Sequence, residues 1–261
     1  MALDLQGPLD DFQKRTQQLR LTMVAVESAA QQQTTLTTVR LGIDLATVGP
    51  ETRNTTNAMS LVLLASSFEE FVREEVGQCA DLLMTKYGAL TVPIQHKIRR
   101  LYWEVLLSRL SMSRNIMTKT KPKAPDPALI AGAKALLDTG RGFVIDGNAT
   151  LLDRTNFYHS RSNFRPGIVN EIVSRVGIDD IIASVAATTK IKNHFGVTKK
   201  IDSTERLVAK LEEFYLLRNR VVHSISGVAG VGVDAAIDYI KVMELTAEGI
   251  AGALTQQTGT W

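Results

Sequence analysis

The feature of this chain that most restricts its fold is helical periodicity, which recurs along almost its whole length. Apolar residues return every three or four positions, and no long stretch alternates apolar and polar residues as a half-buried strand does. The stretch from Asp234 to about Leu254 carries apolar residues at 236, 240, 243, 247, 250 and 254. Because this spacing places one apolar stripe on one face of a helix, the sequence predicts an all-α fold.

Prolines and glycines divide the chain into separate predicted helices. The proline-rich stretch from Lys119 to Pro127 excludes a helix interior and predicts a linker or an exposed loop. Glycines at 227, 230 and 232 break the chain before the last helix, and residues 140–167 are expected to be mostly irregular. Ser203 or Thr204 is expected to cap a helix. The predicted helices cover residues 9–33, 55–87, 93–111, 127–139, 168–176, 179–190, 203–223 and 234–254.

A chain of 261 residues without an internal repeat is long enough to bury one large core. The content of 44% hydrophobic and 22% charged residues is ordinary for a globular protein. We therefore expect one all-α domain over residues 1–261, with an insertion around 112–167 and an N-terminal extension over 1–53. A division near residue 120 is the alternative.

Several classes of protein are disfavoured by the composition. Cys79 is the only cysteine, which excludes an internal disulfide and a cysteine zinc cluster and favours a reducing, cytoplasmic location. The first ten residues lack the apolar region of a signal peptide. The apolar run from Leu61 to Ala65 is too short to cross a bilayer, so we expect no membrane partner. No metal-ligand spacing is visible, and we predict no metal and no cofactor.

Chemically useful side chains gather at Arg218, Asn219 and His223, near the end of one predicted helix. An imidazole moves protons near neutral pH, and a guanidinium binds phosphate oxygens. Arg218 falls in the apolar stripe of its helix, where an unpaired charge is costly. On a straight helix Arg218 and His223 lie roughly 140° apart. They face one small target only if the helix ends before His223, or if two copies of the site meet across a dimer.

The pattern Arg-Asn-x-x-x-His resembles the signature of the HEPN superfamily of all-helical ribonucleases and nucleotide-binding modules. A second element, Leu61–Arg73, contains Ser-Phe-Glu-Glu-Phe and is similar to the early helix of the RiboL-PSP-type branch of bacterial HEPN proteins or its close relatives. Glu69 interrupts the apolar stripe of this helix, and we expect it to pair with Arg218 and to orient the guanidinium. The resemblance covers this helix and the last two helices, and covers the first 50 residues and 112–167 poorly.

The resemblance implies a HEPN-like helical bundle that cleaves RNA without a metal, by transesterification through the 2′-OH. In that reaction His223 transfers a proton, Arg218 stabilises charge on the phosphoryl oxygens, and Asn219 holds the imidazole or a phosphate oxygen. Implied partners are tRNA or mRNA, a second copy of the chain, and an antitoxin or another protein of a prokaryotic toxin–antitoxin or anti-phage defence system. The alternative is a non-catalytic HEPN-like module that binds RNA, a nucleotide or a protein. A metal-dependent enzyme is disfavoured by the missing ligands.

A second stretch, from Arg154 to Arg165, also combines basic and aromatic residues. Arg154 and His159 fit the bare Arg-x4-His spacing, which shows that the spacing alone is a weak filter. Tyr158, His159, Arg161 and Arg165 form a loop that interleaves aromatic and basic side chains, a composition that stacks on bases and contacts phosphates. We predict that these four residues and Arg154 bind RNA. The alternative is a polar surface loop with buried aromatics.

Overall fold

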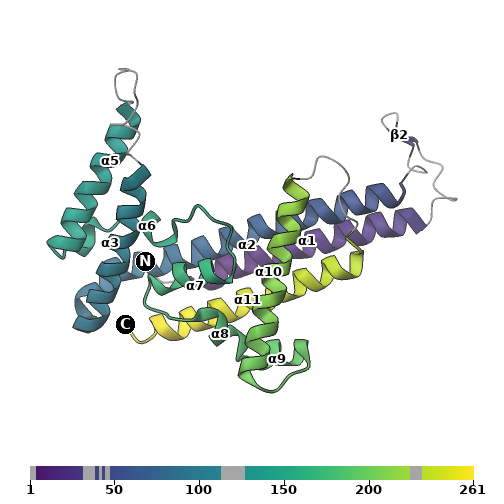
Figure 1. Ribbon diagram of the computed structural model, residues 1–261. Helices are drawn as coiled ribbons and strands as arrows, with labels where there is room; N and C mark the ends of the chain where they lie inside the picture. The colour runs from purple at the N-terminus through teal and green to yellow at the C-terminus, as the bar shows by residue number, and fades with distance from the viewer. Residues whose placement is uncertain (1–3, 32–38, 41–42, 45–47, 113–126, 224–230) are drawn as a thin grey trace.

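The computed structural model of the chain is a bundle of helices, so the predicted all-α class is confirmed (Figure 1). The structure describes residues 4–31, 39–40, 43–44, 48–112, 127–223 and 231–261. Most of the predicted proline-rich linker and two of the three glycines before the last helix, Gly227 and Gly230, lie outside the described residues.

Long helices occupy the predicted segments, with ends that differ by a few residues. They are α1 (Gln6–Gln31), α2 (Pro50–Lys86), α3 (Val92–Met112), α5 (Pro127–Thr139), α7 (Pro166–Ser174), α10 (Lys200–His223) and α11 (Val233–Thr258). Shorter elements are η3 (Tyr87–Ala89), η4 (Gly140–Ile145), η5 (Ala149–Leu151), α6 (Thr155–Tyr158), α8 (Ile181–Ala186) and α9 (Thr189–Phe195). Two short antiparallel strands, β1 (Val39–Arg40) and β2 (Ile43–Asp44), lie between α1 and α2.

Three predictions about local structure were wrong. The single helix expected over 179–190 is two helices, because Thr188 breaks the chain and its hydroxyl accepts a hydrogen bond from the Ile191 amide. Ser203 does not cap α10, which begins at Lys200; its buried hydroxyl donates to the carbonyl of Ala186, at 2.8 Å. Residues 140–167, expected to be mostly irregular, include a π-helical turn and the short helices η5 and α6.

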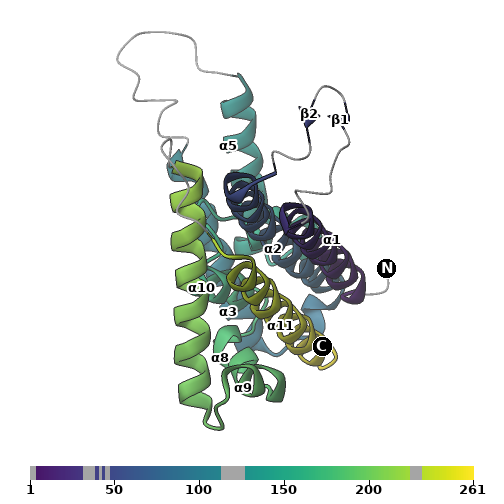
Figure 2. The same cartoon turned by 90° about the vertical axis from the view of Figure 1, so that its right-hand side faces the viewer.

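Helix α2 lies at the centre of the molecule, between α1, α10 and α11. The view in Figure 2 runs nearly along α1, α2 and α11, which form one group, with α10 beside them. An aromatic cluster joins α1 to α2, because Phe12 packs on Phe68 and Phe71 with ring centroids 6.0 and 5.5 Å away. The apolar positions of α2 are inaccessible to solvent, as the fully buried Val72 and Val76 illustrate.

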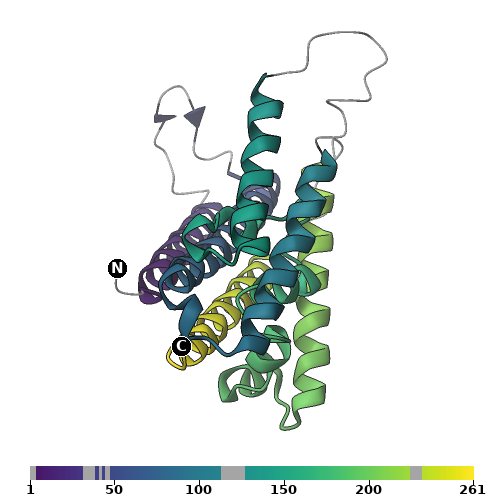
Figure 3. The ribbon, with the colours of Figure 1, turned by 90° about the vertical axis from the view of Figure 1, so that its left-hand side faces the viewer.

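Helices α3 and α5 lie side by side at one end of the molecule (Figures 1 and 3). None of the thirteen residues of α5 is buried. The chain then returns to α2, and Phe143, Phe157 and Phe164 enter the main core with at most 1% of their surface exposed. The segment predicted as an insertion therefore includes both a peripheral helix and residues of the core.

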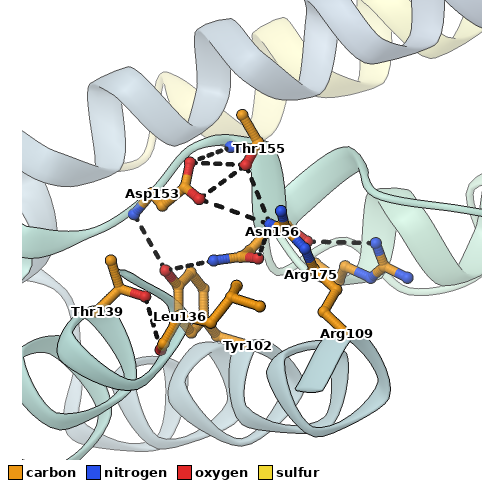
Figure 4. A network of polar contacts seen from close by, with 8 residues as sticks. All are labelled: Tyr102, Arg109, Leu136, Thr139, Asp153, Thr155, Asn156 and Arg175. Atoms are coloured by element: carbon orange, nitrogen blue, oxygen red, sulfur yellow. Dashed lines mark hydrogen bonds and ion pairs between the residues drawn. The ribbon is translucent and has the colours of Figure 1, made fainter. Parts of the chain in front are cut away.

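A polar network fastens α3 to α6 (Figure 4). The Tyr102 hydroxyl accepts hydrogen bonds from the side-chain amide of Asn156, at 2.7 Å, and from the backbone N–H of Asp153, at 3.0 Å. The Arg109 guanidinium donates to the Asn156 side-chain oxygen and to the Thr155 hydroxyl. Because Tyr102 and Asn156 are buried, these bonds replace hydration that both groups lose on folding.

Glu75, on α2, is fully buried, and neither of its carboxyl oxygens has a hydrogen-bond partner among the described residues. Burial, and to a smaller degree the charge of Asp4, raises the pKa of Glu75 to about 8. An unfolded chain releases this proton near pH 4.3. Between these two values the folded protein holds the proton and the unfolded chain does not, so stability decreases as pH rises.

We expect Glu75→Gln to stabilise the protein at pH 8 and to leave its stability close to wild type at pH 5. The amide stays neutral, so the variant avoids a loss of roughly 1.4 kcal/mol for each pH unit in this window. Urea unfolding at both pH values measures the difference. Glu205→Gln, on the exposed side of α10, is the control. A stabilisation by Glu75→Gln that is equal at pH 5 and pH 8 would contradict the assignment.

Candidate functional site

Helix α10 holds Arg218, Asn219 and His223 on one continuous helix whose last residue is His223. Arg218 is half-buried, and its Nε has no hydrogen-bond partner among the described residues, while one Nη donates to the Asn219 side-chain oxygen at 3.2 Å. His223 is exposed at the helix end. Because the helix does not stop before His223, Arg218 and His223 point to different sides of α10 within one copy of the chain.

Glu69 pairs with Arg73 instead of the expected Arg218. Its carboxylate lies 3.4 Å from an Nη of Arg73, one turn further along α2, and accepts a hydrogen bond from the backbone N–H of Phe164 at 3.3 Å. Arg73 also covers the Phe164 ring, with its guanidinium carbon 4.6 Å from the ring centroid. A residue at i+4 on the same face reaches Glu69 without crossing to another helix, which explains why Arg73 takes the place of Arg218.

Glu69 and Arg218 nevertheless belong to one group of side chains around Tyr215. Burial raises the pKa of the Tyr215 hydroxyl well above its ordinary value; the negative charge of Glu69 raises it further, and Arg218 and Arg73 lower it. Within the part of the chain that the structure describes, the Tyr215 hydroxyl has no hydrogen-bond partner. We call this group the α2–α10 polar cluster. Its members are Glu69, Arg73, Asn163, Phe164, Tyr215, Arg218 and Asn219.

The loop before α7 completes this cluster. The side-chain amide of Asn163 donates to the Asn219 side-chain oxygen at 2.9 Å. Arg165 forms an ion pair with Glu212 of α10, at 3.2 Å. The loop with the predicted RNA-binding residues therefore lies against the helix with the predicted catalytic residues, although more than fifty positions separate them in the sequence.

Arg154 lies apart from the rest of its loop and packs on α2. Its guanidinium forms ion pairs with Asp81, at 2.8 Å, and Glu74, at 3.5 Å. A Cβ atom at Gly77 would come within 2.6 Å of the Arg154 guanidinium, so glycine leaves room for this contact. Two carboxylates balance the charge of Arg154, which thus fastens α6 to α2.

The remaining predicted RNA-binding residues differ in exposure. Tyr158 is half-buried and packs against the core, whereas Arg161 is exposed. His159 is half-buried and borders a pocket beside α3. Burial lowers the pKa of His159 below its ordinary value, and the nearby charges of Arg109, Arg175 and Arg161 lower it further. The surroundings of His159 therefore favour the neutral form of its imidazole.

Sequence reasoning missed Arg175, a buried residue that is hydrogen-bonded to the backbone of this loop. Arg175 is 4% exposed, and one Nη donates to the carbonyl oxygens of Phe157 and His159, at 3.0 and 2.8 Å. The other Nη pairs with Glu171 at 2.6 Å. The i,i+4 spacing of Glu171 and Arg175 was a readable signal for the ion pair. Nothing in the sequence pattern indicated that Arg175 would be buried under a loop. Arg73 and Asn163 were also missed.

No group of three or more His, Cys, Asp or Glu side chains suited to a metal ion occurs in the described part of the chain. Among the same residues, no helix has the length and apolar character needed to span a membrane. Comparison with protein-family models, curated proteins and solved structures found no match to this chain.

We expect Arg175→Lys to lower the free energy of unfolding by about 1.5–3 kcal/mol, because an ammonium group does not reach both carbonyls and Glu171 in the way that a planar guanidinium does. Urea unfolding measures this loss. Arg161→Lys, on the exposed part of the same loop, is the matched control and should change stability by less than about 0.5 kcal/mol. Equal losses in the two variants would show that the carbonyl contacts of Arg175 are unimportant.

Proposed function

We propose that this protein is a HEPN-like, metal-independent endoribonuclease. The supporting observation is that the two segments of the HEPN resemblance meet in space. Helix α2 packs on α10, Glu69 of the first segment accepts a hydrogen bond from the Phe164 N–H, and the neighbouring Asn163 donates to Asn219 of the second segment. If the two short motifs matched the family pattern only by chance, they would not need to lie close together in the structure.

In the proposed reaction the 2′-OH of one nucleotide attacks the adjacent phosphorus, and the bond to the leaving 5′-oxygen breaks. His223, exposed at the end of α10, accepts the 2′-OH proton or protonates the leaving oxygen, a contribution of about 10²–10⁴ in rate. Arg218 stabilises the charge on the phosphoryl oxygens, and Asn219 orients a phosphate oxygen or the imidazole. The products carry 2′,3′-cyclic phosphate and 5′-hydroxyl ends, and DNA is not a substrate because it lacks the attacking hydroxyl.

The reaction requires a homodimer. Arg218 and His223 diverge on the continuous helix α10, so one copy of the chain does not direct both side chains at one phosphate. Two copies related by a two-fold axis pair Arg218 of each protomer with His223 of the other. Arg161 and Arg165, in the loop beside α10, then contact the RNA backbone on either side of this cleft.

The biological setting in this proposal is a prokaryotic toxin–antitoxin or anti-phage defence system, with tRNA or mRNA as substrate and an antitoxin or another defence protein as partner. This part follows from the HEPN resemblance. A second candidate is a non-catalytic module that binds RNA, a nucleotide or a protein. The half-buried position of Arg218 favours that candidate, since its guanidinium then has a structural use within the cluster.

Cleavage of total tRNA and of a structured mRNA in EDTA distinguishes the two candidates. We expect wild-type protein to cleave and His223→Ala to be at least about 10²-fold slower, because the proton-transfer group is lost. His96→Ala, which removes another exposed histidine on α3, is the control and should cleave like wild type.

Cyclic-phosphate ends on the products would support the transesterification. Equal cleavage by wild type and His223→Ala would contradict the role of His223. Absence of cleavage by wild type, at concentrations where the protein is dimeric, would favour the binding module.

The dimer makes a separate prediction for mixed variants. We expect Arg218→Lys and His223→Ala each to be inactive, and a mixture of the two, dissociated and reassociated, to recover cleavage. In the mixed dimer one composite site still combines Arg218 of one protomer with His223 of the other. Cleavage assays on the separate and mixed proteins, with size-exclusion chromatography, measure the recovery. Failure of the mixture to recover, with mixed dimers present, would contradict the shared site.

A further inference from the structure

A pocket of about 270 Å³ lies between α3 and the loop that joins α6 to α7. Leu101, Val105 and Ile168 form its apolar part. His159 and Arg161 contribute to its polar side, together with the serines that flank Arg161. A pocket with one apolar wall and a few fixed polar groups is the usual form of a small-molecule site. The catalytic residues of the proposed function do not line it.

The polar side of the pocket is held in place before any ligand arrives. Arg175 fixes the carbonyls of Phe157 and His159 from beneath the loop. The Ser160 hydroxyl accepts a hydrogen bond from the backbone N–H of Ser162, at 3.1 Å, which closes a turn around Arg161. A preorganised loop loses less conformational entropy when it binds a ligand.

Arg161 is the cation of this pocket that has no carboxylate partner within the described residues. The two acids in the lining have other partners: Glu171 pairs with Arg175 at 2.6 Å, and Glu104 lies 3.8 Å from Arg100. An exposed guanidinium without a partner suits a phosphate, which it binds through two parallel hydrogen bonds. The neutral imidazole of His159 offers one donor and one acceptor, which suits the polar edge of a nucleobase.

The pocket continues toward the α2–α10 polar cluster. A second, more open hollow of about 440 Å³ shares Arg161, Ser162 and Ile168 with the first and extends to Asn163 and Arg165. Asn163 in turn is hydrogen-bonded to Asn219, beside Arg218. The two adjoining hollows and the hydrogen bond between Asn163 and Asn219 thus lead from His159 to the proposed catalytic helix.

We propose that this pocket binds one nucleotide unit, with its base against Leu101, Val105 and Ile168, its polar edge at His159 and its phosphate on Arg161. The unit comes either from a single-stranded RNA or from a free nucleoside monophosphate. The first source rests on the proposed ribonuclease function, for which the pocket would select the nucleotide near the cleaved bond. The second source stands without it.

Histidine side-chain NMR signals test this proposal. The full-length His223→Ala protein is titrated separately with AMP, GMP, CMP, UMP and a short single-stranded oligoribonucleotide, which this variant leaves intact. The His159 signal is assigned with His159→Gln. We expect saturable shifts of the His159 signal. Arg161→Ala should weaken binding about tenfold or more through the lost phosphate contact, and the matched control Lys199→Ala, an exposed lysine immediately before α10, should not.

Shifts of the His159 signal with the monophosphates, with the oligoribonucleotide or with both kinds of ligand support the nucleotide pocket. The kind of ligand that causes them identifies the source of the nucleotide unit. No shift of His159 with any ligand, or equal weakening by Arg161→Ala and Lys199→Ala, overturns it. The proposed function fails separately: a wild-type protein that binds nucleotides here but cleaves no RNA keeps the pocket and loses the nuclease. A wild-type protein that cleaves RNA, with a His159 signal that shifts with no ligand, keeps the nuclease and loses the pocket.

Discussion

Burial of the apolar residues of α2 is the interaction on which the rest of the structure depends, because α1, α6, α10 and α11 all pack against this one helix. The helix extends over 37 residues, and its central positions, such as Val72 and Val76, are inaccessible to solvent. Burial of this kind supplies most of the stabilisation of a helical bundle. The buried Glu75 on the same helix opposes it increasingly as pH rises from about 4.3 to about 8, because the folded protein then keeps a proton that the unfolded chain releases.

The polar positions of α2 explain how the candidate site is assembled. Glu69 and Arg73 hold Phe164, whereas Glu74 and Asp81 hold Arg154, so α2 anchors the start of α6 and the end of the loop that follows α6. Between these anchors the loop turns outward and presents His159 and Arg161. The loop after α6 and helix α10, which border the proposed RNA-binding surface, therefore both pack on α2. This shared support fixes the position of the nucleotide pocket relative to α10.

The sequence predicted the helices well where one apolar stripe is continuous. The bounds of α5 match the prediction, and α2, α3 and α11 differ by a few residues at either end. Periodicity did not reveal the break at Thr188, because the apolar spacing continues from α8 into α9 and a single cap residue decides the boundary.

For the site, sequence reasoning identified the residues that gather but not their pairing. An acid inside one stripe and an arginine inside another indicated that Glu69 and Arg218 are near each other, and both lie close to Tyr215. The partner of Glu69 was not predictable from this argument, since the sequence offers two arginines that can form the ion pair, Arg73 on the same helix and Arg218 on another. Burial of Arg175 depends on the path of a loop, and loop paths leave no periodic signal.

The central claim of this account is that two copies of the chain bring the ends of α10 together. Pulsed electron resonance between spin labels measures this directly. The label is attached through Arg220→Cys, an exposed position three residues before His223; the native Cys79 is fully buried and does not react. We predict one narrow intermolecular distance between the labels, short enough for both α10 ends to border a single cleft. A labelled protein that binds or cleaves RNA without any intermolecular distance would contradict it.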